Sequence, residues 1–152
     1  MKNTISLLLI LTISQIVISQ DITINGELKL WHKIELTLNG PSLSEEASTF
    51  TDYRMDVTFT HTASGETFVV PGFFAADGDA ANSSAVSGNK WKAYLRPNKI
   101  GEWSYTIDFY NNPNVAISNT PNGKVDIYSR LIYIYELSSI TKEIIKQDES
   151  VF

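Results

Sequence analysis

The sequence predicts an all-β fold, an immunoglobulin-like antiparallel β-sandwich formed by one domain. Three observations support this prediction: segments in which apolar and polar residues alternate, turn residues that separate these segments at intervals of about ten residues, and the lack of helical spacing before residue 130. Successive side chains of a strand point to opposite faces, so alternation gives each strand one face for the core. The 152 residues include no Cys, so a hydrophobic core rather than disulfide bonds must hold the domain together.

Residues 1–19 are predicted to be a signal peptide rather than part of the domain. Lys2 supplies a short positive region, and the run from Ile5 to Ile18 is mostly apolar. This run is too short for a retained transmembrane helix. No Cys follows it as a site for lipidation. We therefore expect a secreted or periplasmic chain that begins at Gln20 and has no membrane partner after cleavage.

The chain expected after cleavage is acidic. Without Lys2 it has 11 basic residues against 17 acidic ones, a net charge of −6. Its Lys and Arg residues are scattered and form no basic stripe. This charge disfavours nucleic acid and anionic membranes as partners, because both attract concentrated positive charge. We expect a neutral or well-solvated partner.

The first half of the domain is predicted to contain three strands. Apolar residues at even positions from Leu28 to Leu38 predict the first, which Asn39-Gly40-Pro41 should end. Alternation from Tyr53 to Phe59 predicts the second, and Ala63-Ser64-Gly65 predicts a tight turn into the third, so that these two form a hairpin. Pro71 has no amide hydrogen for a ladder bond, so it indicates a bulge or a sheet edge.

The second half is predicted to contain three more strands. Residues 75–88 are small and polar, which is typical of a mobile surface loop. Residues 89–97 follow as a strand with Trp91, Ala93 and Leu95 inward. Further strands are expected at residues 102–110 and 123–129. The sandwich is therefore expected to cover residues 20–129.

The stretch RPNKIGEWSYTI at residues 96–107 is predicted to be a structural corner. Pro97 ends one strand, Gly101 permits the turn, and Trp103 opens the next strand on its core face. Tyr105 lies where a tyrosine corner would place it, with its hydroxyl bonded to upstream backbone. Large alternating side chains are far more often core than a ligand-binding strip, since burying each contributes about 1.5–3 kcal/mol.

Three ordered stretches suggest a family: WHKIELTLNGP, FTDYRMDVTFTHTASGETFVVPGFF and NKWKAYLRPNKIGEWSYTI. Together they resemble the N-terminal domain of unknown function that precedes the barrel of bacterial apiosidase-like glycoside hydrolases. The resemblance covers about residues 27 to 110. It implies a non-catalytic β-sandwich packed against, or tethered to, a polysaccharide-degrading barrel. It offers no catalytic residue to carry over.

The resemblance is lost after Pro121, where the family would continue through a last strand into a barrel. Residues 130–152 are therefore a divergent tail, for which two interpretations remain open. The apolar run from Leu131 to Tyr135 is the last sandwich strand, or the tail is truncated or out-of-frame sequence that lacks the catalytic part. Residues 139–150 could also form a short C-terminal helix with Ile140, Ile144 and Ile145 on one side.

Polar residues offer little evidence of chemistry. Asp77, Asp79 and Asn82 supply oxygen atoms, but their loop lacks the spacing and the bidentate acid of an EF-hand. His32 and His61 have no Cys or acid at metal-ligand spacing, so a structural or solvated role is expected for each. We expect no metal site, no cofactor and no catalytic residue.

Several aromatic residues lie outside the predicted core pattern. Trp31 and Tyr94 fall on the charged sides of their strands, and Phe74 and Tyr110 lie near strand ends. Exposed aromatic rings stack on sugars or mark interfaces. These four are our candidates for contact with a glycan or with the barrel.

The sequence therefore favours a non-catalytic accessory module of a secreted carbohydrate-degrading enzyme. Such a module docks on, or orients, a glycoside hydrolase barrel that is absent from this chain. The alternatives are a carbohydrate-binding module and a stand-alone secreted adhesion or structural domain. The expected partner is a glycoside hydrolase barrel or a polysaccharide.

Overall fold

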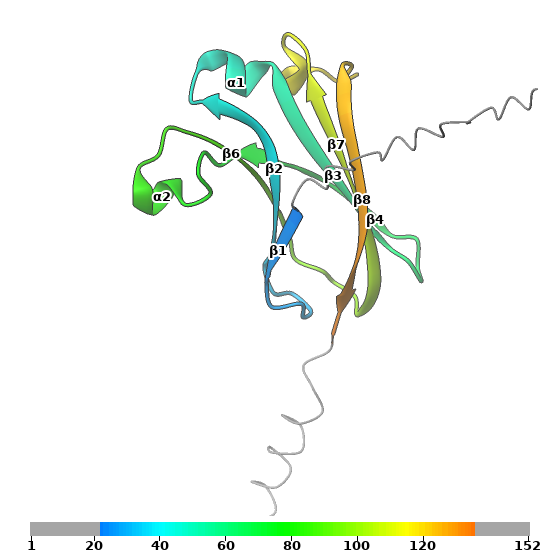
Figure 1. Ribbon diagram of the computed structural model, residues 1–152. Coiled ribbons are helices and arrows are strands. Elements are labelled where there is room, and N and C mark those ends of the chain that lie inside the picture. Colours follow the sequence, from blue (N-terminus) through cyan, green and yellow to red (C-terminus); the bar gives the residue numbers. More distant parts are fainter. Residues whose placement is uncertain (1–21, 136–152) are drawn as a thin grey trace, which may run out of the picture.

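The computed structural model describes residues 22–135, which form two facing antiparallel sheets of four strands each (Figure 1). The first sheet has the order β1 (Ile22–Gly26), β2 (Ile34–Ser44), β6 (Ser87–Leu95), β5 (Phe73–Phe74). The second sheet has the order β4 (Thr67–Pro71), β3 (Tyr53–His61), β7 (Gly101–Asn111), β8 (Lys124–Ile134). This is the strand order of an immunoglobulin-type sandwich with one additional strand, β4. The predicted fold class is confirmed. The predicted signal peptide and C-terminal helix lie outside the described residues.

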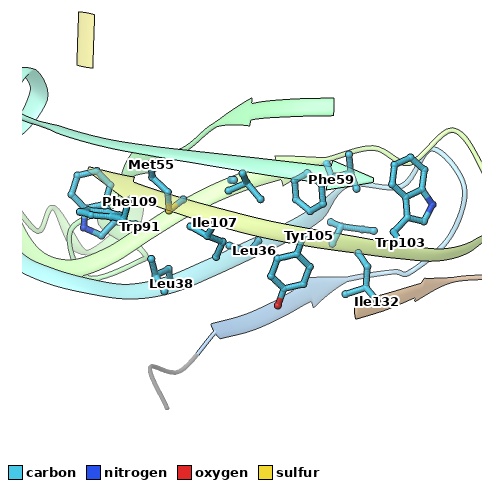
Figure 2. Packing of buried hydrophobic residues seen from close by; sticks show 14 of the residues in the cluster. Leu36, Leu38, Met55, Phe59, Trp91, Trp103, Tyr105, Ile107, Phe109 and Ile132 are labelled. Carbon is cyan, nitrogen blue, oxygen red and sulfur yellow. The ribbon is translucent and has the colours of Figure 1, made fainter. Parts of the chain in front are cut away.

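The core lies between the two sheets and uses the positions that alternation predicted. Trp91, Ala93 and Leu95 of β6 are buried, and so are alternate residues of the strands facing it. In the second sheet the buried alternating residues are Met55, Val57 and Phe59 of β3 and Trp103, Tyr105, Ile107 and Phe109 of β7. Figure 2 shows Trp91 and Phe109 packed at one end of this core and Trp103 at the other. Trp91 and Phe109 meet edge to face, with ring centroids 4.9 Å apart, a favoured aromatic geometry.

The predicted start and end of the first strand are both wrong. Residues 27–33 turn rather than extend, and β2 begins only at Ile34. Asn39-Gly40-Pro41 does not end the strand, because β2 continues to Ser44 through a bulge between Asn39 and Leu43. Gly40 crosses the indole of Trp91 so closely that a Cβ there would lie 2.7 Å from Cδ1 of the ring. The sequence pattern also did not predict β1.

The chain crosses from one sheet to the other at Pro71-Gly72. The predicted hairpin of β3 and β4 is confirmed, and β4 is an edge strand, which tolerates the missing amide hydrogen of Pro71. The Gly72 N–H donates to the carbonyl of Met55 over 2.7 Å. Phe73 and Phe74 then pair with β6 in the first sheet. Pro71-Gly72 therefore lies at a sheet edge, as predicted.

Three one-turn helical segments were not predicted from the sequence. These are α1 (Ala47–Thr51), α2 (Ala80–Ser83) and the 3₁₀ turn η1 (Val115–Ile117). Each is too short to show helical periodicity. The predicted loop 75–88 contains α2 and the start of β6, and its Ala76 is buried, so this segment is only partly a solvated loop.

The last strand is longer than predicted. β8 continues to Ile134 and pairs with β7 along its length, with Ile134 opposite Gly101. The sandwich therefore extends beyond residue 129, and the run that begins at Leu131 is sandwich strand. Among residues 22–135, no helix has the length and apolar character needed to cross a membrane.

Candidate functional site

The predicted corner between β6 and β7 is a rigid, buried structure. Trp103 is fully buried, and its indole N–H donates to the Lys99 carbonyl over 3.1 Å. Its ring stacks on Phe68 with centroids 5.9 Å apart. Gly101 adopts a φ of 110°, which a residue with a Cβ rarely does, and Pro97 is buried. These contacts fit the structural role predicted for the corner.

Tyr105 and His61 complete the packing around this corner. Tyr105 is buried against Phe59, and burial raises the pKa of its hydroxyl, although the nearby charge of Arg130 opposes the shift. The bond from the Tyr105 hydroxyl to upstream backbone stays a prediction. The His61 ring is bonded to the Ser64 hydroxyl over 2.8 Å and to a backbone carbonyl over 2.9 Å, which fits its expected structural role.

Trp31 lies on the turn between β1 and β2, and the corner holds that turn. The Trp31 N–H donates to the Pro97 carbonyl over 2.9 Å. Its φ of 63° is left-handed, which costs a non-glycine residue energy. The side chain is 65% exposed. The predicted exposure of Trp31 is confirmed, although it lies on a turn rather than in a strand.

The end of β8 joins the same region. The Tyr135 N–H donates to the Leu28 carbonyl over 2.7 Å, and Lys29 and Tyr135 form a parallel bridge. Three segments distant in the sequence therefore meet at the lower end of the sandwich in Figure 1. The apolar end surface consists of their exposed large apolar side chains, which are Trp31, Ile100, Leu131, Tyr133 and Tyr135.

Several charged groups beside the apolar end surface form ion pairs. Lys29 lies 2.9 Å from a Glu27 oxygen, and His32 lies 3.1 Å from the same oxygen. The hydrogen bond and charge of Lys29, helped by the charge of His32, lower the pKa of the Glu27 carboxyl. Lys99 pairs with Glu66 over 3.1 Å. A partner that covers this surface therefore meets these groups as ion pairs rather than as isolated charges.

Tyr94 lies on the outer face of the first sheet, as its position in the strand predicted. Its ring is partly exposed and contacts Phe73, with centroids 5.4 Å apart. The ammonium of Lys33 lies 4.7 Å from the centre of the Tyr94 ring. The predicted exposure is confirmed, and glycan contact by Tyr94 stays a prediction.

The other two aromatic candidates are more buried than expected. Phe74 turns toward the core and contacts Trp91 with centroids 5.3 Å apart, because it occupies an inward position of β5, while Phe73 is the exposed residue. Tyr110 is only 8% exposed. A register shift between Phe109 and Tyr110 buries two consecutive residues, which breaks the alternation. Tyr110 thus offers no open ring to a partner.

The acidic loop that follows β5 uses its carboxylates locally. Asp77 accepts a hydrogen bond from the Asp79 N–H over 2.8 Å, and Asp79 accepts one from the Asn82 amide over 2.7 Å. Hydrogen bonds, first from Ser83 and then from the Asp79 N–H, lower the pKa of Asp77. Within residues 22–135, no group of three or more His, Cys, Asp or Glu side chains is placed to hold a metal ion.

Sequence reasoning missed most of the apolar end surface. Leu131, Tyr133 and Tyr135 alternate with the buried Ile132 and Ile134, so both faces of this part of β8 are apolar. A run that is apolar on both faces is typical of a strand covered on both sides. In an edge strand, this run is the signal that could have indicated an interface.

Comparison with known proteins identifies a family. The family model described as "Domain of unknown function (DUF5060)" matches residues 27–110, more than half of the chain. No curated protein and no solved structure matches the chain. The matched segment runs from the turn that carries Trp31 through the corner to β7, so it contains much of the framework that holds the apolar end surface. The chain belongs to DUF5060, a family of domains of unknown function.

Proposed function

We propose that this protein is a non-catalytic accessory module that docks on a glycoside hydrolase barrel through the apolar end surface. The observation that carries the proposal is that five exposed large apolar side chains lie on three segments whose backbones meet at one end of the sandwich. Exposed apolar surface of this kind on a soluble domain marks an interaction site. The proposal places the protein outside the cytoplasm, in keeping with the predicted signal peptide.

The composition of this surface suits a protein partner. Trp and Tyr are the residues that most often dominate the binding energy of protein interfaces. Trp31, Tyr133 and Tyr135 provide three such rings, and the rings of Tyr133 and Tyr135 lie 4.9 Å apart. Backbone hydrogen bonds fix the segments that carry them, so little ordering entropy is lost on binding.

The choice of a glycoside hydrolase as partner rests on the resemblance of this chain to the domain that precedes such barrels. The proposal of a role without catalysis rests on the same resemblance, which implies a non-catalytic sandwich.

The test is to measure binding between this protein and an apiosidase-like glycoside hydrolase barrel from the same genome by isothermal titration calorimetry. We expect Trp31→Ala and Tyr133→Ala each to weaken binding about tenfold, the effect of losing about 1.4 kcal/mol. Val69→Ala is the matched control, because Val69 is as exposed as Trp31 but lies on edge strand β4. Absence of binding, or equal losses in all three variants, would contradict the proposal.

A further inference from the structure

A groove lies at the other end of the sandwich from the apolar end surface. It is lined by α1, η1, the start of β3 and the crossover from β4 to β5, and it has a volume of about 340 Å³. The start of β3 pairs with the end of β7, whereas His61 at the end of β3 pairs with Trp103 at the corner. Figure 1 accordingly shows α1 at the top of the molecule and the turn between β1 and β2 at the bottom. The two sites are separate.

Aromatic rings from distant parts of the chain line this groove. Phe50 of α1 is 55% exposed and Phe73 of β5 is 41% exposed, so each presents ring surface to solvent. Tyr53 and Trp91 line the groove more deeply, with ring centroids 6.3 Å apart. Core packing holds both of these rings, because each of them also contacts Phe109. Such rings keep their orientation when a ligand binds.

Arg54 and Asp56 form an ion pair in the groove, and their two charges cancel. The Nε atom of Arg54 lies 2.8 Å from a carboxylate oxygen of Asp56. A second nitrogen of the Arg54 guanidinium donates to the Ser118 carbonyl over 2.8 Å, which fixes the pair in place. Both side chains are partly buried and line the groove. They offer fixed donors and acceptors next to the aromatic rings without a net charge.

We propose that this groove binds sugar rings of a neutral polysaccharide. The apolar faces of a sugar ring fit against Phe50 and Phe73, and its hydroxyl groups suit the donors and acceptors of Arg54 and Asp56. An ionic ligand is disfavoured because the charges of Arg54 and Asp56 are already paired with each other and leave no free charge to bind it. The volume lies within the range of about 300–1,000 Å³ found for small-molecule sites. The choice of a saccharide over another neutral ligand rests on the proposed function.

The groove opens toward a longer aromatic surface. Phe73 contacts Tyr94 on the outer face of the first sheet, and Lys33 lies over the Tyr94 ring. A polysaccharide chain that enters the groove at Phe73 can therefore continue across this face. Tyr94, which the sequence indicated as a candidate for glycan contact, becomes the next contact along the same path.

The test is affinity gel electrophoresis of the purified protein in gels that contain hydroxyethyl cellulose, xylan, glucomannan, laminarin or pullulan. Alginate and polygalacturonate serve as anionic comparisons, and a proline-rich peptide is titrated separately as an apolar ligand. We expect retardation by at least one neutral polysaccharide. Phe50→Ala and Phe73→Ala should each raise the dissociation constant about tenfold, equivalent to about 1.4 kcal/mol. Both residues are exposed enough for the variants to fold.

Trp31→Ala is the control that separates the two sites, because it lies on the apolar end surface and should leave retardation unchanged. Asp56→Asn should also weaken binding, because it leaves the Arg54 charge unpaired. Four outcomes would overturn the proposal: no retardation by any neutral polysaccharide, retardation by anionic ones alone, binding of the peptide alone, or retardation that Phe50→Ala and Phe73→Ala do not change. The assay uses no barrel, so failure of docking leaves its result intact.

Discussion

Replacing Trp103 by Ala should destabilise the corner that holds both the core and the apolar end surface. Trp103 is fully buried, stacks on Phe68 and lies 5.2 Å from the His61 ring by centroids. It also donates to the Lys99 carbonyl. Ala removes the ring and this hydrogen bond together. Because the corner supplies the Pro97 carbonyl that binds the Trp31 N–H, the loss should extend to the turn.

The magnitude follows from two contributions. Truncating a buried Trp to Ala costs about 3–5 kcal/mol through lost burial and the cavity that remains. A hydrogen bond of this kind contributes about 0.5–1.5 kcal/mol, and measured truncation costs already include part of it. We therefore expect a loss of about 4 kcal/mol for Trp103→Ala, a large fraction of the about 5–15 kcal/mol that stabilises a typical domain. Trp103→Phe keeps one buried aromatic ring but loses the indole N–H and part of the buried volume, and it should lose about 1–2 kcal/mol.

The assay is urea unfolding followed by far-ultraviolet circular dichroism, which does not depend on the replaced indole. Trp31→Phe is the matched control, because Trp31 is exposed and its replacement should change the free energy of unfolding by less than about 0.5 kcal/mol. A loss below about 1 kcal/mol for Trp103→Ala would refute the view that this side chain holds the corner. Equal losses for Trp103→Ala and Trp31→Phe would refute it as well.

Two further predictions concern the first sheet. Gly88→Ala should lower the free energy of unfolding in urea by about 3 kcal/mol, because its Cβ would lie 2.1 Å from the Ala76 carbonyl oxygen. Gly65→Ala is the control: its Cβ would meet no atom within 4 Å, so it should lose only about 1 kcal/mol through left-handed strain. Equal losses in the two variants would contradict this prediction. Burial opposes ionisation of Glu35, but hydrogen bonds and the charge of Lys92 outweigh burial and lower the pKa of its carboxyl. The ionised Glu35 therefore stabilises the folded protein above the unfolded pKa, and this contribution is lost as the pH falls through the folded pKa. Wild type should therefore exceed Glu35→Gln by up to about 1 kcal/mol at pH 7, and this difference should vanish once the pH lies below the folded pKa of Glu35; a difference that persists there would contradict this prediction.

The sequence predicted the strands whose alternation is uninterrupted. In β7, Trp103 to Phe109 alternate without a break, because each inward position faces the opposite sheet. The prediction failed where the backbone departs from a flat ladder. The bulge at Gly40 prolonged β2, and the register shift at Tyr110 buried a residue that alternation placed outside. Bulges change which face a side chain occupies. Asn39-Gly40-Pro41 indicated a strand end rather than a bulge, and no local pattern indicated the shift at Tyr110.

The candidate sites were predicted less completely than the strands. Trp31 was identified because an aromatic residue among charged neighbours breaks the pattern. The other residues of the apolar end surface, such as Ile100 and Tyr133, come from other segments, and only the backbone bonds of the folded chain bring these segments together. The groove combines Phe50 and Phe73 with a buried Trp from β6, so its existence depends on packing between elements that no single stretch of sequence encodes.

Hydrogen exchange of this protein, measured with and without the glycoside hydrolase barrel, tests docking through the apolar end surface most directly. We predict slower amide exchange on binding in residues 28–33, 98–102 and 131–135, because these segments carry or flank the exposed apolar side chains. Exchange in residues 47–56 and 71–74, around the groove, should stay unchanged. Protection confined to the groove, or unchanged exchange throughout the chain at saturating barrel, would contradict the account.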